Sequence, residues 1–256
     1  MARSTKVLAF VAAAVLSSSA LAHDFFLLPD QFTSSAGGTL RVQASVGSSF
    51  PALENTVTAD RFDRLFAAGA GRPQLSVAGP GAKALNLQVT GADQGLLVAA
   101  VKTKDRDVEY AEDRIPLILE EYRVSPEAVA AVNALTKPRT LKVSSRRFAK
   151  TMMCVQRCGD RAAAARPLGV DLEFVSTGGG ADHFRLLSRG RPLPNYPVDL
   201  VDKGAKRRHL RTDANGDVHL PGQARGAQML FAAVMTLPSG GERFTLNLST
   251  LTFTRP

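Results

Sequence analysis

The chain has 256 residues, a formal net charge of +9, 45% hydrophobic and 21% charged residues, four His, two Cys and no Trp. This balance is typical of a globular protein and excludes wholesale disorder, and two cysteines exclude a disulfide-rich scaffold and an all-cysteine zinc site. The length allows one large domain or two small ones.

The first 22 residues have the pattern of a secretory signal peptide. Arg3 and Lys6 make a basic start, and residues 7–16 form an apolar run shorter than the roughly 20 residues of a bilayer-spanning helix. Residues 20–22, Ala-Leu-Ala, form a small-residue cleavage motif. We therefore expect removal of residues 1–22 and a secreted protein, periplasmic if the source is a Gram-negative bacterium. An uncleaved membrane anchor is the alternative.

Cleavage after Ala22 would make His23 the first residue of the mature chain. A free α-amine and its own imidazole can chelate a metal ion, because both nitrogens lose their protons near neutral pH. Nitrogen ligands of this kind favour Cu(II), Ni(II) and Zn(II). The alternative is that a histidine simply follows a good cleavage site.

Short extended patterns separated by turn residues dominate the chain from residue 23 onward. Polar and apolar residues alternate over 39–44, and residues 95–101 form a continuous apolar run that is typical of a buried strand. Turn signals recur at intervals of about ten residues toward the C-terminus. The pattern predicts a mainly β protein built from antiparallel sandwiches.

A helical insertion interrupts this pattern over residues 115–135. Ser125, Pro126 and Glu127 have the order of an N-cap, a first-turn proline and an early acidic residue, which predicts a helix over 126–135. A further helical turn can precede it at 118–122. We expect the insertion to lie against the first sheet. Residues 146–154 fit either a helix or a strand.

The Ala- and Arg-rich segment 160–167 predicts a boundary between two modules. The first module would cover residues 23–160, with its insertion, and the second would cover 168–256. Within the second module, Asn215 and Gly216 supply the signal of a hairpin turn between two strands.

Cys154 and Cys158 form a Cys-x-x-x-Cys pair in a chain expected to enter an oxidising compartment. A disulfide is the leading interpretation, and it requires the backbone to turn so that the Cα atoms lie about 4.4–6.8 Å apart. The alternative is a Cu(I) site that also uses the thioethers of Met152 and Met153.

Motifs of enzymes are absent from the sequence. It has no Gly-x-Ser-x-Gly, no His-Glu-x-x-His and no phosphate-binding glycine loop, so we do not expect an enzyme. A copper oxygenase with an N-terminal histidine is disfavoured because the chain has no Trp. The basic stretch 203–211 is interpreted first as a solvated hairpin, and the alternative partner for a secreted protein is an anionic lipid headgroup or an acidic protein rather than nucleic acid.

Several short motifs follow one another in a familiar order. They are residues 23–29 (HDFFLLP), 120–122 (EEY), 147–151 (RFAKT), 167–173 (PLGVDLE), 190–198 (GRPLPNYPV), 212–216 (TDANG) and 250–253 (TLTF). In this order the chain resembles a periplasmic domain-of-unknown-function family related to NikM-type nickel and cobalt uptake accessory proteins. The resemblance covers nearly the whole chain after residue 22.

The resemblance implies two β-sandwich modules, of which the second would be immunoglobulin- or transthyretin-like, and a role near transition-metal handling. Two positions depart from the family pattern: Phe26 replaces its usual Trp, and Met235 stands where members often carry a His. A methionine there would suit only a softer ion such as Cu(I).

The sequence thus predicts a non-enzymatic metal-uptake or metal-handling accessory that binds nickel, cobalt or copper. The expected ligands are the α-amine and imidazole of His23, with Asp24, His183 and Met235 as further candidates. A membrane transporter or an envelope component would be its partner. The main alternative is an envelope adhesion or scaffold module that binds no metal.

Overall fold

The computed structural model describes residues 23–35, 38–159, 161–178, 183–203, 207–222 and 225–255. The expected signal peptide at 1–22 lies outside these residues. No helix in the described ranges combines the length and apolar character that a bilayer crossing requires.

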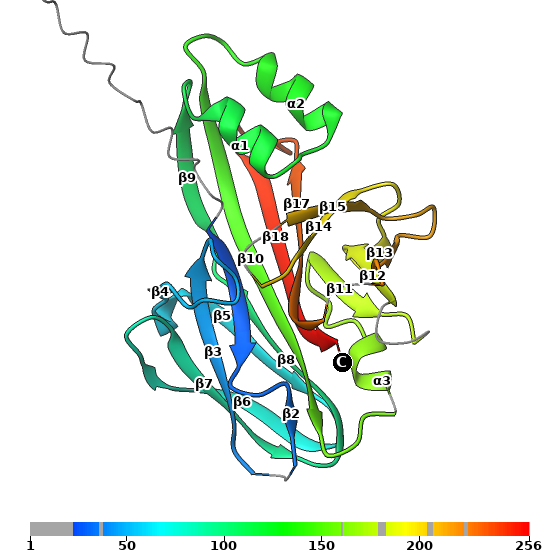
Figure 1. The fold of residues 1–256 in the computed structure, drawn as a ribbon. Coiled ribbons are helices and arrows are strands. Elements are labelled where there is room, and N and C mark those ends of the chain that lie inside the picture. Colours follow the sequence, from blue (N-terminus) through cyan, green and yellow to red (C-terminus); the bar gives the residue numbers. More distant parts are fainter. Residues whose placement is uncertain are drawn as a thin grey trace, which may run out of the picture.

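Strands dominate the described chain, and helices are few and short (Figure 1). The strands are β1 (Asp24–Pro29), β2 (Thr33–Ser34), β3 (Leu40–Gly47), β4 (Asn55–Thr56), β5 (Phe62–Ala68), β6 (Gly71–Pro80), β7 (Leu85–Ala92), β8 (Gly95–Thr103), β9 (Arg106–Ala111), β10 (Thr140–Val155), β11 (Leu172–Ser176), β12 (His183–Ser188), β13 (Arg191–Pro192), β14 (Pro197–Val201), β15 (Arg207–Arg211), β16 (Asp217–His219), β17 (Gly226–Thr236) and β18 (Phe244–Arg255). The helices are η1 (Ala59–Arg61), α1 (Ile115–Glu121), α2 (Pro126–Asn133) and α3 (Ala162–Ala165). The prediction of a mainly β protein is confirmed.

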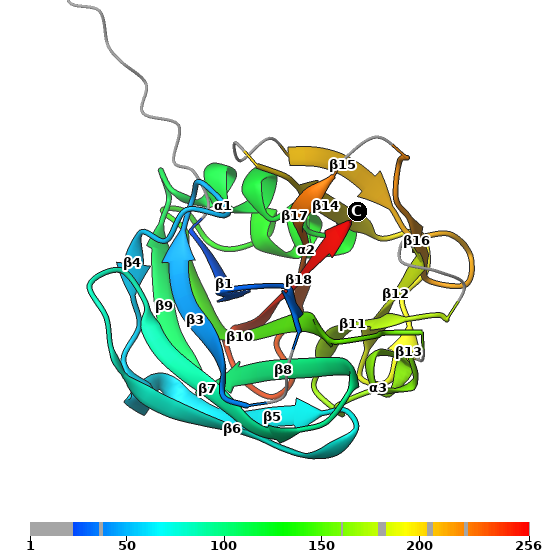
Figure 2. The same ribbon diagram turned by 60° about the horizontal axis from the view of Figure 1, so that its bottom comes forward.

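The strands form three sheets. The central sheet runs in the order β15-β14-β17-β18-β10-β8-β5, with β2 and β9 also paired to β10. The N-terminal sheet has the order β1-β3-β7-β6 with β4 beside β3, and the C-terminal sheet joins β11, β12, β13 and β16. Seen from one end, these two smaller sheets lie on either side of the long central strands (Figure 2).

The central sheet continues across the predicted boundary at 160–167. Strands β10 and β18 pair in parallel from Val143 opposite Phe244 to Thr151 opposite Thr252. One sheet therefore contains strands from both sides of the predicted boundary, with a smaller sheet packed on each side of it. Helix α3 lies within the boundary segment, where Ala164 is buried in the core between the central and C-terminal sheets.

Strand β10 contributes to all three large cores, which explains why residues 146–154 could not be assigned from their pattern. Met153 packs with the N-terminal sheet, Met152 packs with the C-terminal sheet, and Leu141 packs under the helices. A strand that is buried on both faces has no clear alternation of polar and apolar residues. The segment is a strand throughout.

The helical insertion packs at one end of the central sheet (Figure 1). Ile118 and Val132 are buried with side chains from β10, β17 and β18, so the helices cover strands from both predicted modules and not only the first sheet. The predicted N-cap is confirmed: the Ser125 hydroxyl accepts a hydrogen bond from the Ala128 N–H at 3.3 Å, with Pro126 in the first turn.

The chain makes the predicted tight turn at residues 212–216, but the strands before and after this turn belong to different sheets. Gly216 has a φ of +77° and donates its N–H to the Asp213 carbonyl at 3.1 Å. Strand β15 before the turn pairs with β14, whereas β16 after it pairs with β12. The prediction of a hairpin is therefore wrong, because the flanking strands find partners that are distant in sequence.

The first and last described strands are tied together by side chains. Thr250 donates its hydroxyl to the Phe25 carbonyl at 2.8 Å, and Thr252 donates to the Leu27 carbonyl at 2.6 Å. These threonines are buried, so each bond also satisfies a polar group inside the protein. Strand β1 is thereby fixed over the middle of the central sheet.

Candidate functional site

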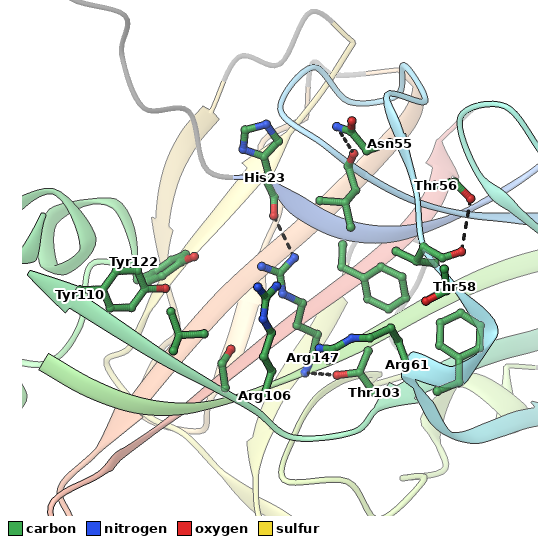
Figure 3. A pocket seen from close by; sticks show the side chains of 16 residues that line it. His23, Asn55, Thr56, Thr58, Arg61, Thr103, Arg106, Tyr110, Tyr122 and Arg147 are labelled. Atoms are coloured by element: carbon green, nitrogen blue, oxygen red, sulfur yellow. Dashed lines mark hydrogen bonds between the residues drawn. The ribbon is translucent and has the colours of Figure 1, made fainter.

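A pocket of about 520 Å³ opens beside His23, at the start of β1. Its walls come from β1, β3, β4, η1, β5, β8, β9, β10 and the residue that follows α1 (Figure 3). The site therefore gathers segments from the N-terminal sheet, the central sheet and the helical insertion. Binding pockets for small molecules commonly have volumes of about 300–1,000 Å³.

Three arginines from different elements converge on this pocket. Arg61 ends η1, Arg106 begins β9 and Arg147 lies in β10, and Figure 3 shows their guanidinium groups close together. The register of β10 against β9 places Ser145 opposite Arg106, so Arg147, two residues on, emerges on the same face.

The backbone holds these arginines in place. Arg147 donates its N–H to the Thr103 hydroxyl at 3.0 Å, and its guanidinium Nη1 donates to the His23 carbonyl at 3.1 Å. The Arg61 carbonyl accepts the Lys104 N–H at 2.8 Å, which ties η1 to the turn after β8. The cationic end of the pocket is thus anchored to two neighbouring strands.

No described carboxylate lines this end of the pocket. Among the described lining residues there is no Asp or Glu, and none of the three guanidinium groups forms an ion pair in the described ranges. Asp24 and Asp60 lie outside the lining but within electrostatic range of Arg147 and Arg61, so they offset part of the positive charge. The lining itself carries only positive charge, which favours an anionic ligand.

Aromatic side chains complete the walls. The Phe25 and Phe62 rings lie 6.1 Å apart between centroids, and Tyr110 and Tyr122 lie together near the arginines (Figure 3). Burial raises the pKa of both tyrosine hydroxyls above the ordinary value, so they keep their protons and remain hydrogen-bond donors. The pocket therefore combines donors for an anion with apolar surface for its organic part.

His23 stands at the rim of this pocket, and the other predicted ligands do not gather around it. Asp24 is only 4% exposed and pairs with Arg207 Nη2 at 2.5 Å. Met235 is buried in the core beneath the helices, and His183 lies on the C-terminal sheet. No group of three or more His, Cys, Asp or Glu side chains that could hold a metal ion occurs in the described part of the chain.

Asp24 belongs to a charged cluster behind β1. Burial raises the pKa of its carboxyl to about 7, although the Arg207 guanidinium opposes this shift. Its Oδ1 has no hydrogen-bond partner among the described residues. Arg207 also contacts Asp199 at 3.2 Å, and Asp199 in turn binds Arg123 at 2.6 Å. The carboxylate is thus engaged in contacts within the protein.

The fit to a metal at His23 can be judged from these neighbours. Glu121 is a nearby carboxylate whose pKa His23 influences, and the His23 carbonyl, not its imidazole, is directed at Arg147 (Figure 3). Three arginines line the same pocket, so its lining does not fit a bare transition-metal ion, which prefers neutral imidazole and anionic ligands. The α-amine chelate depends on residues before His23, which lie outside the described residues, and stays a prediction.

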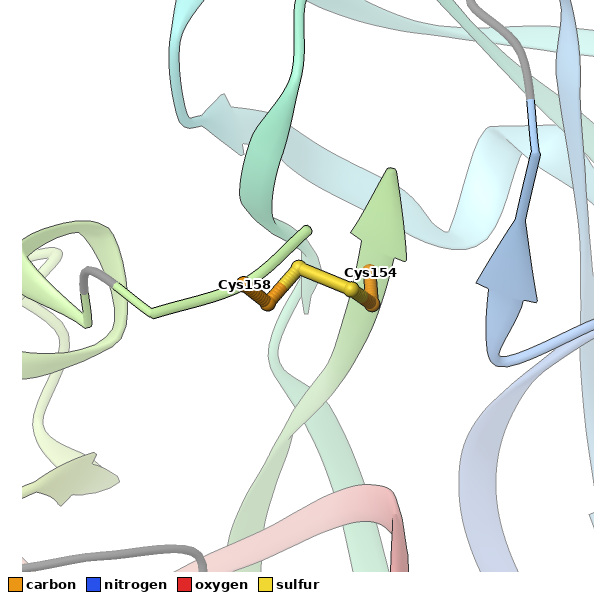
Figure 4. The surroundings of a disulfide bond; sticks show 2 residues. All are labelled: Cys154 and Cys158. Carbon is orange, nitrogen blue, oxygen red and sulfur yellow. A yellow bond between two sulfur atoms is a disulfide. The ribbon is translucent and has the colours of Figure 1, made fainter. Parts of the chain in front are cut away.

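The two cysteines occupy the opposite end of β10. Cys154 and Cys158 are joined in a disulfide with Cα atoms 5.6 Å apart (Figure 4). The strand ends at Val155 and the chain then turns, with Gln156 in the left-handed region at φ 61°. Both thiols are used by this bond, and Met152 and Met153 point into different cores.

The arginines were not recognised as site residues from the sequence. More than 40 positions separate Arg61 from Arg106 and Arg106 from Arg147, and each resembles an ordinary surface arginine. Only the pairing of β9 with β10 and the placement of η1 bring them together.

Comparison with known proteins gives one family and little else. A family model described as "Domain of unknown function (DUF4198)" matches residues 20–236. The D0-D1 domain of intimin is similar over 91% of this chain and 98% of that chain, with 14% identity and a TM-score of 0.23. The TIE protein of Bacillus anthracis is similar over 89% of this chain and 40% of that chain, with 11% identity and a TM-score of 0.24. Similarity at these TM-scores supports no assignment, and no curated protein matches the chain.

Proposed function

This chain belongs to the DUF4198 family, and we propose that it is a secreted, non-enzymatic binding protein that holds a small organic anion in the pocket beside His23. The observation that carries the proposal is the convergence of Arg61, Arg106 and Arg147 on a pocket without a lining carboxylate. Arg61 and Arg147 are half-buried and Arg106 is exposed, so all three guanidinium groups are accessible to a ligand whose carboxylate they can bind by charge-assisted hydrogen bonds.

The shape and lining of the pocket support an organic ligand rather than an inorganic ion. Its 520 Å³ exceeds what a single oxyanion fills, and Phe25, Phe62 and Val108 supply apolar wall beside the arginines. The Tyr110 and Tyr122 hydroxyls can donate hydrogen bonds to an oxygen of the ligand. We propose a carboxylate attached to an apolar or aromatic body.

Binding is favoured over catalysis by the kind of groups present. Guanidinium and hydroxyl groups orient and neutralise an anion, whereas chemistry on it would need a nucleophile with an adjacent base. The imidazole of His23 stands at the rim, and its backbone carbonyl is the atom bonded to Arg147. We therefore assign the pocket to capture of a ligand.

The expected role in handling nickel, cobalt or copper, and with it a relation to NikM-type uptake accessories, remains compatible with this proposal. A metal ion held by a carboxylate chelator would enter as an anion, which the arginines attract. The imidazole of His23 would then offer one further nitrogen ligand. For the second sandwich we propose an immunoglobulin- or transthyretin-like fold, supported by the packing of the C-terminal sheet on β14, β17 and β18.

Calorimetric titration of the purified chain with benzoate and with its uncharged match benzamide tests the proposal, followed by citrate and acetate. We expect the carboxylates to bind, with affinities that fall as salt is added, and benzamide not to bind. Loss of one charge-assisted contact costs about 1.5–3 kcal/mol, so R61Q and R106Q should each weaken binding roughly 10–100-fold.

Arg191→Gln is the matched control, because Arg191 is an exposed arginine on β13, outside the pocket. This variant loses the same charge and should bind as the unmodified chain does. Equal affinity of R61Q, R106Q and R191Q for every carboxylate would overturn the proposal. Co-purification of an envelope protein with a chain that binds no anion would favour the scaffold alternative.

A further inference from the structure

Two of the four histidines lie side by side on neighbouring strands of the C-terminal sheet. His183 begins β12 and His219 ends β16, and the two are directly opposed in the antiparallel register. Their rings are nearly perpendicular, with centroids 5.3 Å apart. Opposed side chains on one face of an antiparallel pair lie within contact range of one another.

Both imidazoles lie on the outer face of this sheet. The neighbouring positions Phe184 and Val218 are fully buried in the core, so the histidines, one residue away on each strand, point in the other direction. The His219 side chain is 60% exposed, and His183 is half-buried. A ligand from solvent can therefore reach both rings.

A carboxylate already orients one of the rings. Asp213 Oδ2 lies 3.4 Å from His219 Nε2, while Asp213 Oδ1 accepts the N–H groups of Asn215 and Asp217 at 2.8 and 2.9 Å. A histidine that donates one ring N–H to a carboxylate presents the lone pair of its other nitrogen, the arrangement common among metal-binding histidines. Asp213 therefore acts as a positioning residue for Nδ1 of His219.

From this juxtaposition we propose that His183 and His219 form a two-imidazole site for a divalent transition-metal ion of the Zn(II), Cu(II) or Ni(II) class. Metal–nitrogen distances of about 2.0–2.1 Å place two coordinating nitrogens on the same ion close to 3 Å apart. Rings with centroids 5.3 Å apart reach this separation by side-chain rotation alone. Water completes the coordination shell, because no third ligand converges on the pair in the described residues.

The local charge is compatible with a bound cation. The next opposed pair on the same face is Arg185 with Asp217, joined at 2.6 Å, so this arginine is neutralised by its partner. His209 offers a contrast, because Arg123 Nη1 lies 3.2 Å from its Nδ1 and Asp199 occupies the same nitrogen at 2.8 Å. The opposed pair, by contrast, has a second imidazole and the acidic neighbour Asp213 within the described residues.

This site is independent of the proposed anion pocket, since it lies on a different sheet and shares no residue with it. Zn(II), Cu(II) and Ni(II) salts are titrated into the whole chain and into H183Q, H219Q and the double variant. Each single variant should lose metal binding at this site as completely as the double variant does, because the site needs both imidazoles to bind the ion. Asp213→Asn should weaken binding by roughly 10–100-fold, as loss of an orienting partner does.

His209→Gln is the matched control and should bind the metals like the unmodified chain. Paramagnetic resonance of the Cu(II) form adds a direct readout, with coupling to two imidazole nitrogens expected in the unmodified chain and loss of this signal expected after either substitution. Binding that persists unchanged in the double variant, or no binding by the unmodified chain, would overturn the site. Carboxylate binding should be the same in all these variants, so failure here is distinguishable from failure of the proposed function.

Discussion

Arg147 donates a hydrogen bond from Nη1 to the backbone carbonyl oxygen of His23 at 3.1 Å, which joins the middle of β10 to the start of β1. The same guanidinium group belongs to the cationic end of the pocket. One side chain therefore both binds the residue that precedes β1 and supplies part of the charge that would hold an anion. A ligand that engages Arg147 should also influence how firmly β1 is held.

Replacing Arg147 with lysine should separate charge from geometry. Lysine keeps the positive charge but has no planar fork of donors, so R147K should weaken carboxylate binding and speed amide hydrogen exchange at the start of β1. Hydrogen exchange measured by mass spectrometry, with and without benzoate, checks both effects. Arg191→Lys serves as the control. Unchanged exchange in R147K would show that the bond does not hold β1.

Asp24 should make the stability of the fold depend on pH. The pKa of its carboxyl is about 7 in the folded chain against an ordinary value of 3.8, so the folded state binds the proton more tightly than the unfolded state does. Its contribution to stability is complete below about pH 4 and is lost as the pH rises through about 7, with a total on the order of 4 kcal/mol.

Asp24→Asn removes this titration. The difference in free energy of unfolding between D24N and the unmodified chain should therefore shift in favour of D24N as the pH rises from 4 to 7. Urea unfolding at intervals across this range measures it, with Asp30→Asn as an exposed control. A difference that stays constant with pH would contradict the burial of an ionisable carboxyl at this position.

A buried ion pair joins the central sheet to the C-terminal sheet. Lys150 on β10 donates to Glu173 Oε2 on β11 at 2.7 Å, and the two side chains are 7% and 2% exposed. Removal of one partner leaves a buried charge, so K150M and E173Q should each lower the free energy of unfolding by about 3–5 kcal/mol. The double variant K150M/E173L should lose less than the two single losses combined, which a double-mutant cycle measures. Strict additivity would argue against the pair.

The disulfide should contribute only modestly to stability. Cys154 and Cys158 are four positions apart, and closing so short a loop restricts the unfolded chain by about 2 kcal/mol. The double variant C154S/C158S should thus remain folded and unfold at slightly lower urea concentration. The carboxylate affinity of the pocket should not change, since the bond lies at the other end of β10. Loss of folding in this variant would show a larger role than loop closure.

The N-terminal chelate remains testable on secreted material. Mass spectrometry should find a mature chain that starts at His23, and that chain should bind Cu(II) and Ni(II) through its amine and imidazole. Insertion of one alanine before His23 should abolish this binding and leave the binding by His183 and His219 intact. Equal Cu(II) affinity of the extended and mature chains would exclude the chelate.

Local features of this fold were predictable, whereas the pairing of distant strands was not. The cap at Ser125 depends on neighbouring residues, so its sequence pattern sufficed. The parallel pairing of Val143 with Phe244 joins segments about a hundred residues apart, and their patterns also fit separate sheets. The pocket shows the same limit, because Arg61, Arg106 and Arg147 become one site only through that long-range architecture.

The threonine bonds between β18 and β1 make the pocket depend on a part of the chain that does not line it. Every described residue that lines the pocket lies at or before position 147, whereas Thr250 and Thr252 bind the backbone of the strand that carries Phe25. A truncation that removes β18 would therefore leave all the lining residues in the sequence and still withdraw two buried hydrogen bonds from the strand that forms one wall of the site.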